Sequence, residues 1–210
     1  MDADPVEIRV LGCLIEKQRT TPDAYPLSLN SLRLACNQST SRDPVVDYDE
    51  STIRAGLERL SRRGWVRLAS GPGSRAAKYR HLFGEAMSLD DAEMAVLAVL
   101  MLRGPQTAAE ISQRSERLYT FAPGEVDETL ERLAGRELVA RSARRPGERG
   151  ERYTQLLGSD ASSAEEPEPR EAEPSFSSSL EERVARLEKE VAELRSQLLN
   201  ETNTGSVPFS

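Results

Sequence analysis

Two stretches of the chain repeat each other: IRAGLERL at residues 53–60 and VDETLERL at residues 126–133. Each is soon followed by an arginine and then by an apolar pair, Trp65-Val66 in the first case and Leu138-Val139 in the second. An apolar segment with an acidic start precedes each stretch, and a Pro-Gly loop follows each one, in the same order. We therefore expect one unit of about 70–80 residues, a common domain size, to occur twice in the chain.

The repeated unit is predicted to open with a capped helix. DPVEIRVLGCL at 4–14 and DDAEMAVLAVL at 90–100 share an acidic first residue, a glutamate three positions on, and apolar residues at helical spacing. Asp4 and Asp90 are therefore the predicted N-caps. A second helix is expected to begin at Ser28 and at Thr107, and a third to run from about 49 to 63 and from about 123 to 136.

A β-hairpin is predicted to close each unit. The loops GPGSR at 71–75 and RPGER at 145–149 lie between segments that are compatible with β-strands. Three helices followed by a hairpin form the winged-helix arrangement, whose third helix is the one able to enter a DNA major groove. The predicted fold class is mainly α, of the α+β winged-helix type, with winged-helix domains at 1–84 and 85–157.

The composition excludes several classes of protein. The chain has 210 residues, 38% of them hydrophobic and 30% charged, with a formal net charge of -7. It contains no apolar run of the roughly 18 residues that a membrane helix needs, and it begins without the profile of a signal peptide, so we expect a cytoplasmic protein. Two cysteines and one histidine are too few for a four-ligand zinc site or a disulfide framework, so neither a metal nor a cofactor is expected.

The last quarter of the chain differs from the repeats. Residues 158–179 are rich in Ser, Glu and Pro and predict a disordered acidic linker. Residues 180–199 follow a heptad pattern that favours a parallel dimeric coiled coil, although a single amphipathic helix docked on its own domain would show the same spacing. The tail at 200–210 is expected to be disordered. The candidate dimerisation residues are Leu180, Val184, Leu187, Val191, Leu194 and Leu198.

Several motifs make the chain similar to a known family. EKQRTTPDAYPLSLNSL at 16–32, ACNQ at 35–38, SRDPV at 41–45 and RSERLYTF at 114–121 resemble the bacterial YceH family. The resemblance implies a tandem winged-helix protein that dimerises, in a family of largely uncharacterised biochemical role. The chain departs from the family pattern at Ser39, where a lysine is usual, and so lacks one positive charge in the loop between helices two and three.

DNA binding with a regulatory role is the leading functional hypothesis. The third helix of the first repeat should expose Arg54 and Arg62, and its wing is basic, so this repeat is the better candidate. The third helix of the second repeat carries carboxylates at 125, 127, 128 and 131, which would repel phosphates. The candidate nucleic-acid-binding residues are Arg42, Arg54, Arg62, Arg75, Lys78, Arg80, Arg144, Arg145 and Arg149.

The alternative hypothesis is a protein-interaction scaffold that uses the winged helices as docking surfaces for a protein partner. Residues 42–44 and 114–121 are candidate contact elements, although Tyr119 and Phe121 are also suited to the core. No enzymatic activity is expected. His81 is interpreted as a surface or wing residue, Cys13 and Cys36 as core residues, and GPGS at 71–74 as a turn, since it lacks the spacing of a phosphate-binding loop.

Overall fold

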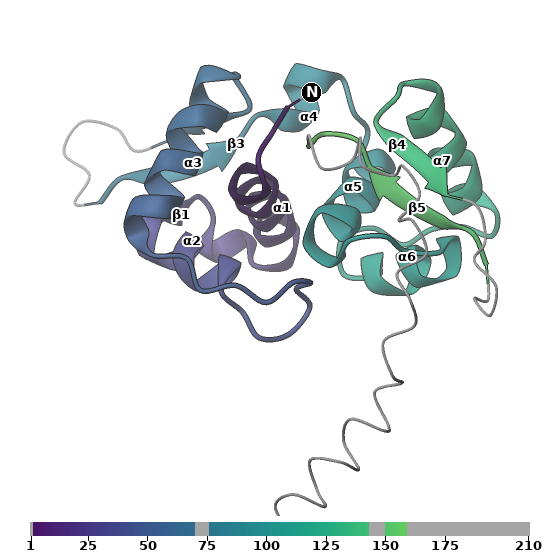
Figure 1. The fold of residues 1–210 in the computed structure, drawn as a ribbon, viewed down its shortest axis with the longest axis horizontal. Coiled ribbons are helices and arrows are strands. Elements are labelled where there is room, and N and C mark those ends of the chain that lie inside the picture. The colour runs from purple at the N-terminus through teal and green to yellow at the C-terminus, as the bar shows by residue number, and fades with distance from the viewer. Residues whose placement is uncertain (1, 70–75, 143–149, 159–210) are drawn as a thin grey trace, which may run out of the picture. The chain divides into compact units, whose positions relative to one another are not determined.

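The computed structural model describes residues 2–69, 76–142 and 150–158 (Figure 1). This part of the chain is an α+β structure of helices and small antiparallel sheets. The predicted linker, heptad helix and tail lie outside the described residues, as do Arg75, Arg144, Arg145 and Arg149. Within the described ranges, no helix combines the length and the apolar content that a bilayer crossing requires.

The helices of the first repeat begin at the predicted caps. In α1 (Pro5–Thr20), the Asp4 side chain accepts a hydrogen bond from the Glu7 backbone, and the Glu7 side chain accepts one from the Asp4 backbone. α2 (Leu29–Cys36) begins after Ser28, and α3 (Glu50–Arg62) after Asp49. These caps satisfy backbone N–H groups that the first helical turn leaves without partners, so each start was readable from its sequence.

The hairpin of the first repeat has an additional strand. β2 (Val66–Leu68) and β3 (Lys78–His81) form the predicted antiparallel pair, and β1 (Leu27–Ser28) pairs with the other edge of β3. A short 3-10 helix (Pro22–Ala24) precedes β1, and α4 (Phe83–Met87) follows β3. The sheet therefore joins the start of α2 to the wing.

The second repeat has the same order of elements: α5 (Asp91–Arg103), α6 (Ala108–Ser115), α7 (Glu125–Gly135), β4 (Val139–Ser142) and β5 (Arg152–Gln155). α5 and α6 both begin with capping boxes. A single bridge between Gln106 and Tyr153 stands where β1 pairs with β3 in the first repeat. α7 begins two residues later than predicted, after Gly124 at a φ of 84°.

The two repeats share one hydrophobic core. α1 packs along α5 at the centre of the described unit (Figure 1), and every residue of α5 from Ala92 to Leu102 is buried. A Cβ on Gly12 of α1 would lie 3.0 Å from Leu102, so glycine allows the two helices to approach closely. A helix that is apolar on all sides has to be covered on all sides, and here α1, α6 and α7 all pack against α5.

Candidate nucleic-acid interface

The third helix of the first repeat, α3, separates an apolar face from a charged one. Ile53, Leu57 and Leu60 are buried, as their spacing predicted. Arg54 and Arg62 are exposed and, among the described residues, have no ion pair or hydrogen bond to their guanidinium groups. Two positive charges are therefore available on the outer face of the helix. Glu58, also exposed, lies between them in sequence.

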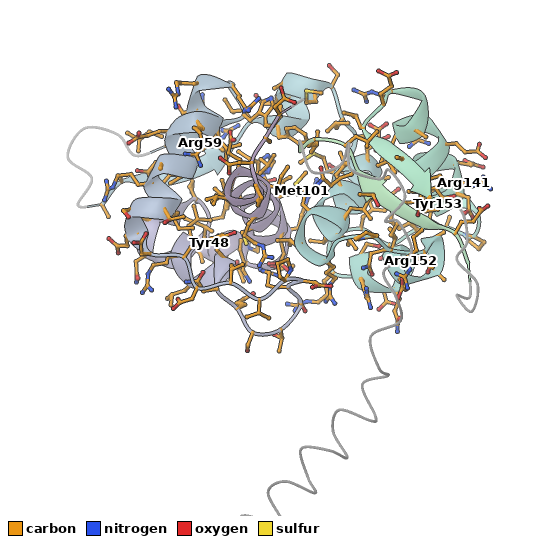
Figure 2. All side chains as sticks on the ribbon, viewed as in Figure 1. Tyr48, Arg59, Met101, Arg141, Arg152 and Tyr153 are labelled. Atoms are coloured by element: carbon orange, nitrogen blue, oxygen red, sulfur yellow. The ribbon has the colours of Figure 1, made fainter. Side chains whose placement is uncertain are left out.

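Two other arginines of this region have structural partners. Arg59, labelled in Figure 2, lies 2.7 Å from Asp4 Oδ2, and Arg63 Nε donates to Glu7 Oε1 at 2.9 Å. The guanidinium of Arg63 also stacks on Trp65, 5.4 Å from the ring centre. Arg59 and Arg63 thus tie the end of α3 to the start of α1, and they are not free for an external ligand.

The hairpin of β2 and β3, called the wing from here on, places three basic residues on one face of the sheet. Arg67 of β2 lies directly opposite Arg80 of β3, and Lys78 is two residues from Arg80, so all three share the face opposite to Val66 and His81. Arg80 forms a 2.8 Å ion pair with Glu85. Arg67 is exposed and was missed by the sequence analysis, although its place next to the buried Val66 could have identified it, because neighbouring side chains of a strand point to opposite faces.

The segment that leads into α3 carries acidic residues, and the structure gives two of their carboxylates a structural role. Asp49 caps α3 by accepting from the Thr52 backbone at 2.7 Å, and this hydrogen bond is the main reason why the pKa of Asp49 is lowered. Asp47 Oδ1 accepts from Asn37 Nδ2 at 3.2 Å. Asp49 thus caps the helix and Asp47 holds the Asn37 side chain, so the presence of both carboxylates follows from folding and does not by itself exclude an anionic ligand.

Arg42 is not on this surface, although it was a candidate for phosphate binding. Its side chain is 0% exposed and donates to both carboxylate oxygens of Glu16, at 3.1 and 2.6 Å. It also donates to the backbone oxygens of Ala35 and Ser41. Burial alone would raise the pKa of Glu16, but Arg42 and Lys17 outweigh it and hold that pKa below its usual value. The structure therefore assigns Arg42 an internal role.

The second repeat presents a different charge distribution. Asp127, Glu128 and Glu131 of α7 are exposed, as predicted. Arg132 and Arg136 are directed to Asp90 and Glu93, in the same arrangement as Arg59 and Arg63 in the first repeat. On the wing, Arg141 pairs with Glu151 and Arg152 with Glu110. These basic groups, at the end of α7 and on the wing of this repeat, are thus paired with neighbouring carboxylates.

Comparison with known proteins identifies the family. The family model described as "Protein of unknown function, DUF480" matches residues 3–148. The chain belongs to the YceH family. The UPF0502 protein YceH of Escherichia fergusonii is 45% identical over 204 residues, which cover 91% of this chain and 92% of the relative. The UPF0502 protein PC1_1804 of Pectobacterium carotovorum is 45% identical over 203 residues, 93% and 95% of the two chains. A UPF0502 protein of Azotobacter vinelandii is 50% identical over 155 residues, 73% and 69% of the two chains.

The structure also locates the other residues that the sequence singled out in this YceH-family chain. Cys13 and Cys36 are buried, as predicted. His81 lies on the wing strand, but only 7% of it is exposed, so its interpretation as a surface residue was wrong. Tyr119 and Phe121 are half-buried and meet edge to face at 4.9 Å, and Phe121 packs against the core. Burial of His81 follows from its pairing with Val66, which no local pattern specifies.

Proposed function

We propose that this YceH-family protein binds DNA and regulates transcription, acting as a cytoplasmic, non-enzymatic, tandem winged-helix protein. The observation that carries the proposal is the pair of exposed arginines on α3, Arg54 and Arg62, which have no ion pair within the part of the chain that the structure describes and stand next to a wing with three basic residues. Fold alone does not give function, so the argument rests on these charges and on their position.

The proposed mode of binding uses α3 and the wing together. α3 enters the major groove, where arginine side chains contact phosphates or guanine edges. The outer face of the wing, with Arg67, Lys78 and Arg80, lies along the phosphate backbone. The second repeat does not use α7 in this way, because Asp127, Glu128 and Glu131 would meet the phosphates.

Dimerisation through the heptads of residues 180–198 is part of the proposal. Val184 and Val191 at one core position with Leu187 and Leu194 at the other favour a parallel two-stranded coil. A dimer would present two copies of α3, which suits a two-fold-related DNA site. The 22 residues of the segment 158–179 mean that the coil does not fix the spacing between the half-sites.

A scaffold that binds a protein partner is the second candidate function. The specific observation in its favour is that, within the described ranges, three large apolar side chains are exposed: Leu34, Val45 and Leu68, at 57%, 59% and 56%. Exposed apolar groups of this kind mark interaction sites when they are contiguous. The charge of α7 adds an acidic surface that a basic partner would complement.

The test is selection of fragmented genomic DNA on the purified full-length protein, with binding followed against salt concentration. Replacement of both Arg54 and Arg62 by Ala is expected to lower the slope of log K against log salt by about 1.8 for each bound protomer, the value for two phosphate contacts. The matched control is Arg117→Ala with Arg141→Ala, which removes two exposed arginines from the second repeat. Absence of enrichment, or an equal effect of the control pair, would overturn the proposal and direct attention to a protein partner.

A further inference from the structure

A polar pocket lies where the first repeat meets the second, away from α3 of the proposed DNA surface. Its volume is about 410 Å³, within the range of small-molecule sites. The loop between α2 and α3 contributes one side, and the end of α5, the helix α6 and the strand β5 contribute the other. The lining residues are Ser41, Arg42, Asp43, Arg103, Pro105, Gln106, Glu110, Arg114 and Arg152.

The pocket has an excess of positive charge. Four arginines and two carboxylates, Asp43 and Glu110, line it, and the carboxylate of Glu16 behind the lining neutralises Arg42, which leaves a formal charge of +1. Glu110 is shared between Arg114, at 3.6 Å, and Arg152, at 3.2 Å. Arg42 is already occupied by Glu16. The single carboxylate of Glu110 is therefore the ion-pair partner of both Arg114 and Arg152.

Arg103 is the least satisfied of these arginines. It is half-buried, and within residues 2–69, 76–142 and 150–158 its guanidinium group has no ion pair or hydrogen bond. Burial, followed by the positive charges of Arg114 and Arg42, lowers the pKa of Arg103, and the negative charge of Glu16 offsets only part of this effect. A half-buried cation that lies near other cations is costly unless an anion joins them, so the arrangement favours an anionic ligand.

One backbone hydrogen bond joins the two sides of the pocket, and side-chain hydrogen bonds order its second side. Asp43 N donates to the carbonyl oxygen of Leu102 at 2.8 Å, which joins the loop of the first repeat to the end of α5. The side-chain Nε2 of Gln106 donates to the carbonyl oxygens of Arg103 and Pro105, at 2.9 and 2.8 Å. Arg152, labelled in Figure 2, donates to the same Pro105 oxygen at 3.0 Å. The pocket is therefore formed before any ligand arrives.

The lining restricts the kind of ligand. Among the described residues that line the pocket, Pro105 is the one without a polar side chain. Sites for aromatic or aliphatic ligands are mainly apolar, so a ligand here has to be compact, charged and largely without hydrocarbon surface. Guanidinium groups match the geometry of phosphate oxygens and can bind them in a bidentate manner.

We propose that this arginine pocket binds a compact phosphate-type oxyanion, with Arg103 and Arg114 as its principal ligands. Arg152 and the Ser41 hydroxyl complete the site. Because the pocket spans both repeats, an occupant fixes the α2–α3 loop against the end of α5. The site is separate from Arg54 and Arg62, and its existence does not depend on DNA binding.

The test is isothermal titration of the full-length protein with sodium phosphate and with sodium pyrophosphate, in chloride buffer and without DNA. Both anions are expected to give saturable binding, tighter for pyrophosphate because it carries more charge. Arg103→Met and Arg114→Met should each weaken binding tenfold or more, since each removes a charge-assisted contact. Arg141→Met, which removes an exposed arginine of the same repeat, is the matched control and should leave the affinity unchanged.

The proposal would be overturned by the absence of saturable binding by either anion, or by equal weakening in Arg141→Met. Arg114→Met keeps the test decisive if Arg103→Met fails to fold, because Arg114 lies on the surface side of α6 with about a third of its side chain exposed. The Arg54→Ala, Arg62→Ala double variant should bind pyrophosphate as the wild type does. Loss of pyrophosphate binding in that variant would place the anion on α3 and would also contradict the inference, whatever the result with DNA.

Discussion

Glu7 Oε1 accepts a hydrogen bond from Nε of Arg63 at 2.9 Å, and Glu93 Oε2 in the second repeat lies 3.3 Å from Nη1 of Arg136. Each glutamate is also the third residue of its helix and completes a capping box there. One buried carboxylate therefore caps the first helix of its repeat and also holds the end of the third helix. The repetition of this contact shows that the two halves of the chain are built by the same internal interactions as well as by the same sequence pattern.

Replacement of Glu7 by Gln is expected to destabilise the protein by about 1–3 kcal/mol, because charge-assisted hydrogen bonds to a buried carboxylate become neutral ones. Glu93→Gln should have an effect of similar size for the same reason. The exposed Glu58→Gln, the same chemical change on α3, should lie within about 0.5 kcal/mol of the wild type. Urea unfolding followed by circular dichroism measures all three, and equal stability of Glu7→Gln and Glu58→Gln would contradict the assigned role.

Stability should fall between pH 6.5 and pH 5 because of His81, the only histidine in the sequence. Burial, followed by the charges of Arg80 and Arg19, lowers the pKa of His81 to about 4. The unfolded chain therefore takes up a proton below about pH 6.5 while the folded protein does not, and stability decreases by about 2 kcal/mol on going from pH 7 to pH 5.

The His81→Gln variant provides the control for this pH dependence. It removes the titrating group, and the free energy of unfolding should then be nearly independent of pH between 6.5 and 5, since carboxylates titrate mainly at lower pH. Urea unfolding at several pH values checks the prediction. A wild-type slope that persists in His81→Gln would show that another group is responsible.

Arg42→Met should be among the most destabilising substitutions of a charged residue in this chain, with a loss of about 3 kcal/mol. It leaves Glu16 half-buried without its main partner and removes the donor to two backbone oxygens. Arg54→Met, on the exposed face of α3, should change stability by less than about 0.5 kcal/mol. Thermal unfolding of the two variants measures this difference in stability. If the DNA proposal holds, folded Arg42→Met should keep the wild-type salt slope, and a lowered slope would contradict the internal role.

Glu58→Gln should strengthen DNA binding if α3 is the contacting helix. Its carboxylate is exposed between Arg54 and Arg62 and repels phosphates, so its neutralisation raises affinity by roughly threefold to tenfold at low salt. Glu131→Gln on α7 is the matched control, since it is exposed at the corresponding position of the second repeat and is not expected to affect binding. Fluorescence anisotropy with a labelled duplex compares the two variants, and equal gains would indicate a general charge effect.

Helix starts were the most predictable part of the fold. Asp4, Asp90 and Thr107 each stand three residues before a glutamate, and all three form capping boxes in the structure. Their partners are three residues away, so the sequence alone contains the whole interaction. The buried face of α3 was predictable for the same reason, because Ile53, Leu57 and Leu60 lie on one side of any regular helix.

Long-range partners were the part that the sequence did not predict. Arg42 was expected at a ligand, but its partner Glu16 precedes it by 26 residues and no spacing rule joins the two. The strand β1 has two residues and exists because it pairs with β3, about 50 residues later. The arginine pocket depends on the contact between Asp43 and Leu102, which brings the segments 41–45 and 114–121 close together. No spacing in the sequence relates these two segments.

The packing of α1 on α5 joins the same helix from each copy of the repeat. A contact between equivalent elements is the form that a symmetric homodimer interface takes, and here both sides belong to one polypeptide. The chain thus resembles two subunits fused end to end. A polypeptide cut down to one repeat would leave the covered side of α1 bare, and we expect such a fragment to associate with a second copy of itself.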